Sequence, residues 1–407
     1  MSLSNQNLAQ AEAVYREARA SVLVIRAALS PTVSSLPSVS ESRAGGSSGP
    51  SGGLKSSFSL PLDISWAPDL WGNIRRGVTA ASANAQASAA NLENARLLYQ
   101  SALAEDYFQL HGLDGLADLF QRTLQSYEEY LTLTKNRRAG GIASDLDVAL
   151  AEAQLYATRA QLQDLAIQRA QLEHAIAVLT GKPPAELSIP GLTLKTPPPP
   201  VPVAVPSVLL ERRPDIAANE RQMAAANEQI GIAQAAFYPT LSLSGALGFQ
   251  NSRLTTWIGW PSRFFSVGAT MAETIFEAGR RRALVAQSQA AFDATIAAYR
   301  QTVLTAFEQV EDNLAALRVL AEESQTVDQS IVSAERALTV STAQYKQGTT
   351  SYLTVIQAQA TALNAERTAV SLLTRRLTAS VLLVQALGGG WESSQLPTPK
   401  DVAAKGN

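Results

Sequence analysis

Two octapeptides decide the fold of this chain: GIASDLDV at residues 141–148 and GTTSYLTV at residues 348–355. They belong to a series of matches about 207 residues apart. Other members of the series join Pro31 to Pro239, the stretch 70–76 to 276–282, and Leu179 to Leu387. Solenoid units repeat every 20–50 residues or so, and a much longer interval indicates a duplicated half-structure. Each half is predicted to run helix, strand, turn, strand, very long helix, tight turn and helix.

Very long helices precede both octapeptides. Residues 72–138 and 279–347 contain no proline, and each is predicted to form one helix about 100 Å long. From Phe292 to Leu317 in the second, apolar residues recur every three or four positions, which is the spacing of a coiled-coil seam. Shorter returning helices are predicted at 144–180 and 214–237. We expect two short helices to stack end to end beside each long one.

Glycine and serine mark the turns between these helices. Glycine suits the left-handed residue that ends a helix, and serine is a common N-cap. The predicted hairpin residues are Gly140, Gly141, Ser144, Gly348 and Ser351.

Alternating apolar and polar residues predict four strands at 32–42, 54–66, 240–250 and 265–272, of which the first has the weakest pattern. This pattern also fits a half-buried sheet in a soluble protein. Lengths of about 10–12 residues and aromatic residues at the strand ends favour a transmembrane barrel. The residues predicted to face lipid are Leu60, Leu62, Ile64, Trp66, Leu241, Leu243, Phe265 and Val267.

Four strands cannot close a barrel, and open strand edges in lipid leave backbone groups without hydrogen bonds. The chain must therefore oligomerise if the strands span a membrane. Three copies would supply twelve strands, which is wide enough for a water-filled lumen.

Composition excludes several other functions. The net charge of −2 gives no basic field for nucleic acid, and the absence of cysteine excludes disulfides and thiolate chemistry. The two histidines, His111 and His174, each stand alone in a helical stretch. No catalytic set, phosphate loop or metal-spaced cluster is visible. We therefore expect neither an enzyme nor a cofactor.

One segment is recognisable. The run PSVLLERRPDIAANERQ at 206–222, continued by NEQIGIA at 227–233 and FYPTL at 237–241, resembles the outer-membrane efflux family, that is, the TolC/OprM-like channels of the NodT lipoprotein type. Residues 69–76 are similar to the family's junction between barrel and helix, and 348–359 to its second periplasmic hairpin. The resemblance covers nearly the whole chain.

This resemblance implies a mainly α-helical fold with a transmembrane β-barrel part. Coiled-coil hairpins form a periplasmic tunnel, and four strands per chain contribute to a twelve-stranded barrel in a homotrimer. It further implies docking of the tunnel tip, with its hairpin turns, onto a periplasmic adaptor protein and an inner-membrane pump, expected to be of the RND type. The location implied is the outer membrane of a Gram-negative bacterium, in contact with its lipid.

The chain is then divided into a first structural repeat at 1–181, a proline-rich linker at 182–207, a second repeat at 208–390 and a C-terminal tail at 391–407. It opens Met1-Ser2-Leu3 without a signal peptide or lipid-acceptor cysteine. We expect the family's N-terminal segment to precede this start.

The entrance at the hairpin tips is the expected gate. The family commonly narrows it with an acidic residue and an arginine, and the matching positions here hold Gln357 and Ala360. The predicted entrance residues are Asp145, Asp147, Glu152, Tyr352 and Gln357. Two interpretations of the acidic residues stay open. They are solvated carboxylates favoured by the helix dipole, or three copies of them form a ring that selects ions.

Three functions remain in view. The first is a passive, gated exit duct of a tripartite efflux system for drugs or other toxic small molecules. The second is the outer-membrane duct of a type I protein secretion system. The third is a soluble coiled-coil scaffold protein, in which the alternating segments form a capping sheet.

Overall fold

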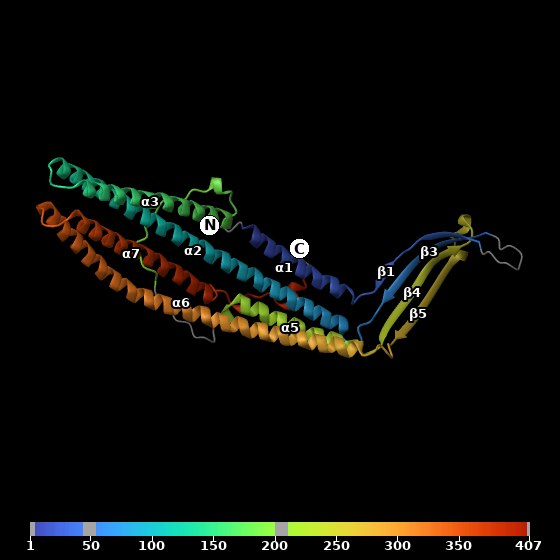
Figure 1. Cartoon of the computed structure of the whole chain (residues 1–407). Helices are drawn as coiled ribbons and strands as arrows, with labels where there is room; N and C mark the ends of the chain where they lie inside the picture. The colour runs from blue at the N-terminus through green and yellow to red at the C-terminus, as the bar shows by residue number, and fades with distance from the viewer. Residues whose placement is uncertain (1–4, 44–53, 200–210, 405–407) are drawn as a thin grey trace. The chain divides into compact units, whose positions relative to one another are not determined.

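A computed structural model describes residues 5–43, 54–199 and 211–404 (Figure 1). Its helices are α1 (Gln6–Ala27), α2 (Asn73–Ala139), α3 (Asp145–Leu179), α5 (Pro214–Ala235), α6 (Arg280–Gln347), α7 (Tyr352–Ala386) and α8 (Pro399–Val402). Its strands are β1 (Thr32–Ser34), β2 (Ser38–Ser42), β3 (Lys55–Trp66), β4 (Thr240–Asn251) and β5 (Arg263–Ala272). Residues 200–207 of the predicted linker lie outside the described residues.

The long helices begin and end within one residue of the positions expected from sequence. Helix α2 has 67 residues and α6 has 68, so each is about 100 Å long at 1.5 Å per residue. Each begins directly after a glycine with positive φ, Gly72 at 79° and Gly279 at 84°. Both helices appear as continuous coils in Figure 1. In the described part of the chain, no helix is both long enough and apolar enough to span a membrane.

The two returning helices have the same length and the same spacing in sequence. Helices α3 and α7 have 35 residues each, and both bounds of α7 follow those of α3 by 207 positions. Each ends before a glycine with positive φ, Gly181 at 73° and Gly388 at 90°. The glycine after each helix therefore lets the chain leave it in the left-handed conformation.

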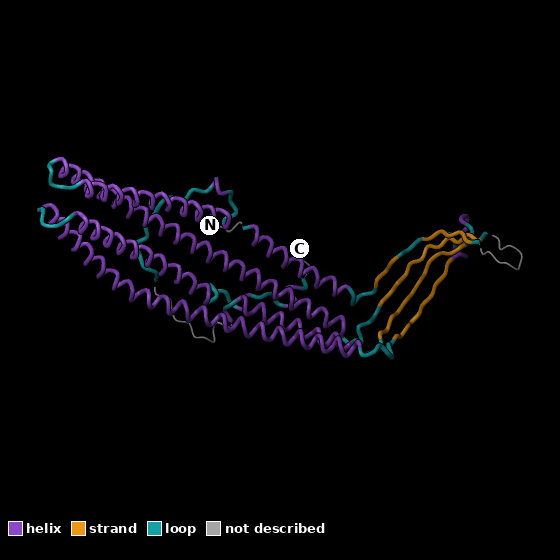
Figure 2. The backbone as a smooth tube through the Cα atoms, viewed as in Figure 1, coloured by secondary structure: helices purple, strands orange, loops and turns teal. Residues whose placement is uncertain are grey.

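The sheet places most of the large apolar residues of its strands on one face. Its strand order is β1-β3-β4-β5, with β2 also paired to β3, and every pairing is antiparallel. Figure 2 shows the strands running side by side. Paired residues of neighbouring strands share a face, and alternate residues of one strand share it too. Leu62 pairs with Leu247, and Leu247 pairs with Phe265. The residues on this face, which we call the apolar face, include Val33, Val39, Phe58, Leu60, Leu62, Ile64, Trp66, Leu241, Leu243, Leu247, Phe249, Phe265 and Val267.

The first predicted strand is wrong as a single element. Residues 32–42 form two short strands, β1 and β2, because Pro37 between them has no backbone N–H to donate to the ladder. Both strands pair with β3 in one continuous register, Thr32 opposite Ser65 and Ser38 opposite Ser59. The interruption at residues 35–37 therefore breaks the ladder of backbone hydrogen bonds, while the chain continues along β3 in the same register.

The chain forms two compact units. Unit 1 comprises Met1–Glu12, Asn91–Ile216 and Thr302–Gln395, and unit 2 comprises Ala13–Ala90, Ala217–Gln301 and Leu396–Asn407. In unit 1, core clusters join α2, α3 and α7 through buried residues that include Tyr127, Val148, Leu155, Val355, Phe120, Leu165 and Leu363. In unit 2, Val22 of α1 packs on Ala81 and Ala85 of α2. Small alanines there let the two helices approach closely.

The described part of the C-terminal tail is folded onto unit 2. Val402 of α8 is completely buried in the same cluster as Val22. Arg19 donates hydrogen bonds to the carbonyl oxygens of Asp401 and Ala404 at 3.4 and 3.1 Å. Thr398 caps α8 in a capping box with Asp401. These contacts hold residues 398–404 on unit 2, where the sequence indicated only a tail.

Candidate functional site

Both predicted hairpins are present in unit 1, and their turns lie at the same end of its helices (Figure 1). At the first turn, Ile142 N bonds to Arg137 O at 2.8 Å and Gly141 N to Arg138 O at 2.9 Å. This is a Schellman motif, with Gly141 at φ 73° in the left-handed position. Gly140 does not have a positive φ, so Gly141 alone needs to be glycine for this reason.

The second turn has the same geometry. Thr349 N bonds to Gln344 O and Gly348 N to Tyr345 O, both at 3.0 Å, and Gly348 has φ 79°. A left-handed residue with a side chain would be strained at this position. The predicted glycine turn is therefore present in both hairpins.

The two predicted N-caps differ. Ser144 makes a full capping box, in which Asp147 N donates to the Ser144 hydroxyl at 3.2 Å and Ser144 N to the Asp147 carboxylate at 2.9 Å. Ser351 also sits at the cap position but makes no side-chain cap hydrogen bond. Its hydroxyl lies 3.4 Å from that of Thr354, which cannot reciprocate as an aspartate does.

Each of the three predicted entrance carboxylates has a local partner. Asp147 is engaged in the capping box, Asp145 forms an ion pair with Arg138, and Glu152 forms one with Lys135 at 2.8 Å. These pairs are exposed and contribute little to stability. They nevertheless place two cations beside the carboxylates, which favours helix-end roles over a strongly negative ring.

In the second hairpin, Tyr352 is buried, with 2% of its surface exposed. Its ring packs on that of Tyr345, with centroids 5.2 Å apart. Burial, with a further contribution from Tyr345, raises the pKa of Tyr352 to about 12. Tyr352 is thus a core residue of the tip, whereas Gln357 is exposed on α7.

Direct contacts between α2 and α6 join the two hairpins. The hydroxyls of Tyr130 and Thr342 lie 3.0 Å apart. Arg137 donates to the carbonyl oxygen of Lys346 at 3.0 Å, and its guanidinium lies 4.7 Å from the ring centre of Tyr345. We call these contacts of Tyr130 and Arg137 the inter-hairpin bridge. None of the residues in it was selected from sequence.

A polar pocket of about 250 Å³ lies between the hairpins beside this bridge. Gln359, which is 3% exposed, lines the pocket, and neither atom of its amide group has a hydrogen-bond partner among the described residues. Glu366 lines the pocket seven residues, or about two helical turns, further along α7. Burial, together with the nearby Glu335, raises the pKa of Glu366 although Arg122 opposes the shift. A buried amide without partners has a high desolvation cost, so this pocket suits ordered water.

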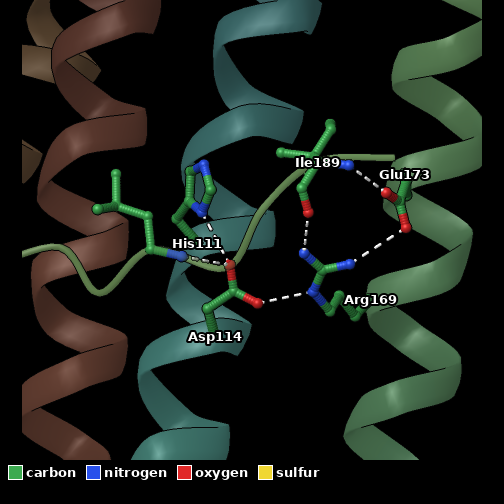
Figure 3. A network of polar contacts seen from close by, with 6 residues as sticks. His111, Asp114, Arg169, Glu173 and Ile189 are labelled. Carbon is green, nitrogen blue, oxygen red and sulfur yellow. Dashed lines mark hydrogen bonds and ion pairs between the residues drawn. The ribbon is translucent and has the colours of Figure 1, made fainter. Parts of the chain in front are cut away.

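A second polar network, away from the tips, holds the segment that follows α3 (Figure 3). Asp114 on α2 accepts from Arg169 Nε at 2.7 Å, lies 2.8 Å from His111 Nδ1, and accepts from Leu192 N at 3.1 Å. Arg169 also donates to the Ile189 carbonyl oxygen at 2.6 Å and to Glu173 at 3.1 Å. The start of the predicted linker is therefore fixed to α2 and α3.

The hydrogen bonds and ion pairs of this network stabilise the fold more at neutral pH than at acidic pH. Burial alone would raise the pKa of Asp114, but hydrogen bonds from Arg169, His111 and Leu192 lower it overall. A carboxyl whose pKa is lowered on folding contributes stability at neutral pH, and that stability is lost as the pH falls through its folded pKa. His111 is a packed residue, with 2% of its surface exposed.

The residues predicted to face lipid all lie on the apolar face of the sheet in unit 2. The opposite face carries mostly polar or small residues, among them Ser59, Asp63, Ser242 and Ser244, together with Phe264 on β5. On β5, Phe265 and Val267 are 84% and 87% exposed. In the described part of the chain, no cluster of three histidine, cysteine or acidic residues could hold a metal ion.

Comparison with known proteins identifies the class. The family model described as outer membrane efflux protein matches residues 2–182 and 205–389. The chain therefore belongs to this family. It is an outer-membrane efflux protein, as the resemblance of residues 206–222 indicated. The prediction of a soluble coiled-coil scaffold is therefore set aside.

Individual relatives support the same class. The pyoverdine export outer membrane protein OpmQ of Pseudomonas aeruginosa is 32% identical over 403 residues, which cover 97% of this chain and 84% of OpmQ. The toluene efflux pump outer membrane protein TtgF of Pseudomonas putida is 30% identical over 393 residues, 96% of this chain and 82% of TtgF. The solved structure of the outer-membrane channel OprN superposes with a TM-score of 0.90 at 30% identity, covering 95% of this chain and 88% of OprN. OpmQ and TtgF are thus named for the export of different compounds.

Proposed function

We propose that this chain is one third of a trimeric exit duct, in which its strands complete a twelve-stranded barrel and its helices a periplasmic tunnel. The observation that carries the proposal is the apolar face of a sheet whose edges are open in the single chain. Strand β5 pairs only with β4 among the described strands, and β1 and β2 only with β3. In lipid such edges need partners, and a second copy of the chain offers the complementary edge.

The spacing of the elements supports two tandem structural repeats. The glycines with positive φ at 72, 141 and 181 recur at 279, 348 and 388, always 207 positions later. A duplicated half of this kind places two strands and one hairpin in each copy. Three chains then contribute six hairpins to one tunnel.

The duct performs no chemistry and is opened at its tips. Its partners are a periplasmic adaptor protein, which docks at the hairpin turns, and an inner-membrane pump of the RND type, which supplies the energy. The cargo is a small molecule. OpmQ and TtgF differ in cargo, so the particular compound depends on the pump.

Trimerisation is tested by cross-linking. The chain has no cysteine, so introduced cysteines report without background. Ser34→Cys and Ser266→Cys lie on the two opposite edge strands of the sheet. In membranes, a panel of such edge pairs should give disulfide-linked dimers and trimers, whereas a pair of cysteines on the central strands β3 and β4 should cross-link only within a chain. A protein that stays monomeric in lipid, with its strands intact, would refute the proposal.

Gating is tested at the inter-hairpin bridge. Arg137→Gln combined with Tyr130→Phe removes contacts between α2 and α6 while leaving both hairpin turns intact. We expect a higher open probability in planar bilayers. Arg138→Gln is the matched control, because Arg138 pairs within its own hairpin. An unchanged open probability in the double variant would show that the bridge does not restrain the tips.

The two interpretations of the acidic residues are separated by the same recordings. Asp145→Ala with Asp147→Ala should leave cation preference nearly unchanged, because both carboxylates have local partners. A large loss of cation preference would support the acidic ring instead.

A further inference from the structure

The connection between β4 and β5 is a folded unit that displays apolar side chains to solvent. Residues 252–262, which we call the β4–β5 knob, are organised around Asn251. The Asn251 amide donates to the hydroxyl oxygens of Thr256 and Ser262 at 3.0 and 2.5 Å, and the Ser262 hydroxyl donates to the Thr256 carbonyl oxygen at 2.8 Å. Trp257 packs its ring on Phe58 at 5.7 Å between centroids. These contacts fix the knob through its polar atoms and Trp257.

Three large apolar residues of the knob take no part in this scaffold. Leu254, Ile258 and Trp260 are 63%, 70% and 75% exposed. An ordered loop that keeps such residues outside is unusual in water and typical of contact with lipid or protein. They therefore need an apolar partner.

Two arginines, Arg253 and Arg263, lie beside these apolar residues, and no acidic residue lies near them in the sequence. Arg263 holds its guanidinium 3.9 Å from the ring centre of Trp260, a cation–π contact that orients it. Arg253 lies within the knob, and the sequence has no aspartate or glutamate from 240 to 272. The carboxylate of Glu41 lies on β2, which β3 separates from β4, and it accepts a hydrogen bond from Ser56 at 3.2 Å. The local charge of the knob is positive in a chain whose net charge is −2.

The strand register places this charge at the end of the apolar face. Arg263 pairs with Phe249 and precedes Phe265 and Val267 by two and four residues, so it lies in the same row as both. Lys55 begins β3 at the same end of the sheet, and its odd position places it on the opposite, polar face. On this face of β5, the apolar residues Val267 and Phe265 are thus followed at the strand end by Arg263, which is stacked on Trp260.

We propose that the β4–β5 knob binds a phosphorylated lipid of the outer leaflet, that is, the phosphate groups and adjoining acyl chains of lipopolysaccharide. This inference rests on the proposed function, which puts the apolar face in lipid. Arg263 and Arg253 donate to the phosphate oxygens, since guanidinium groups match phosphate bidentately. Leu254, Ile258 and Trp260 contact the acyl chains. A free phosphate ion would use the arginines and leave the apolar residues unexplained.

The test uses the whole protein in detergent, titrated with lipid A and followed by native mass spectrometry. We expect Arg263→Gln to weaken lipid A binding about tenfold, as the loss of a charge-assisted hydrogen bond implies. Arg253→Gln should weaken it further. Trp260→Phe should retain binding, and Trp260→Ala should lose it. Lys55→Gln is the matched control and should change affinity less than about twofold, because its charge lies on the other face.

Lipid A without phosphates, phosphatidylglycerol and inorganic phosphate are the competing probes. Binding of lipid A that ignores Arg263, or that falls equally with Lys55→Gln, overturns the proposal. Equal binding of phosphatidylglycerol would indicate a general anionic surface, and equal competition by inorganic phosphate a free-anion site. Either result also overturns it.

Conductance of the same samples reports the proposed function separately. A conducting channel whose lipid A binding is independent of Arg263 refutes this inference alone. A chain that binds lipid A through Arg263 but forms no channel refutes the duct alone.

Discussion

The two hairpin tips share one backbone plan and differ in how their helices are fastened. Arg138 and Asp145 form an ion pair across the first turn, and the residues 207 positions later are Tyr345 and Tyr352, whose rings pack together. An exposed electrostatic contact in one hairpin thus corresponds to a buried aromatic one in the other. The turn itself is unchanged, because the glycine at its centre determines it.

A second contrast between the hairpins is one of charge. Glu128 and Arg159 attract each other across the first hairpin at 2.9 Å. Their counterparts are Glu335 and Glu366. Burial raises the pKa of Glu366, Arg122 opposes this shift, and the charge of Glu335 adds to it. Attraction is therefore replaced by repulsion.

The remaining contrast is between Glu152, paired with Lys135, and its counterpart Gln359, buried without a partner. In the described part, no ion pair joins α6 to α7 between residues 332 and 366. The fold tolerates these exchanges because Val148 and Val355, 207 positions apart, keep one core. We infer that between residues 332 and 366 the second hairpin is held by packing rather than by ion pairs between its helices.

The largest expected effect comes from making the second tip resemble the first at Tyr352. Tyr352→Asp empties a packed site and buries a carboxylate. We expect the opening free energy of the second hairpin to fall by about 3–5 kcal/mol, as for other buried aromatic truncations. Hydrogen exchange of amides 335–366 measures it. The reverse change, Asp145→Tyr, lies on the surface and should stay within about 0.5 kcal/mol. Similar costs for both would show that the tips are fastened alike.

The caps give the next effect. Asp147→Ala removes a reciprocal capping box and should cost the first hairpin about 1 kcal/mol. Thr354→Ala, at the equivalent position, should cost only a few tenths, because Ser351 makes no cap hydrogen bond. Amide exchange in the first turn of α3 and of α7 reports the two costs. A larger loss in α7 would contradict the comparison.

Much of this fold is predictable from local pattern. The bounds of α2 and α6 follow from proline-free stretches bordered by glycine, and the shared face of Leu62 and Phe265 follows from period two. The contacts that could not be predicted from local pattern join residues on different helices. Nothing local shows that Asp114 meets Arg169, 55 residues later, or that Gln359 is buried while Gln357 is exposed. Such contacts require the register between helices, which alanine-rich surfaces leave poorly specified.

A smaller effect with a defined pH dependence is expected at Glu366. Its folded pKa is raised, so its ionised form is disfavoured in the folded tip. The folded state then holds its proton more tightly than the unfolded state does, and stability decreases as the pH rises from the unfolded to the folded pKa. Glu366→Gln should therefore stabilise the second hairpin at neutral pH, with the gain vanishing at acidic pH. Amide exchange at the two pH values, corrected for intrinsic rates, measures it. A gain that grows on acidification would assign the shift to another group.

The smallest effect tests the ion pair that the second hairpin lacks. Glu128 and Arg159 are both about half exposed, so Arg159→Gln should cost the first hairpin about 0.2–1 kcal/mol at low salt. At 1 M salt the screening length is about 3 Å, and the cost should nearly disappear. Introducing the same pair into the second hairpin, by Glu366→Arg opposite Glu335, should stabilise it by more than Glu366→Gln does at low salt and by the same amount at high salt. If the arginine and glutamine variants are equal at both salt concentrations, the two hairpins differ in packing alone, and the exchange of charges between them has no bearing on which one opens.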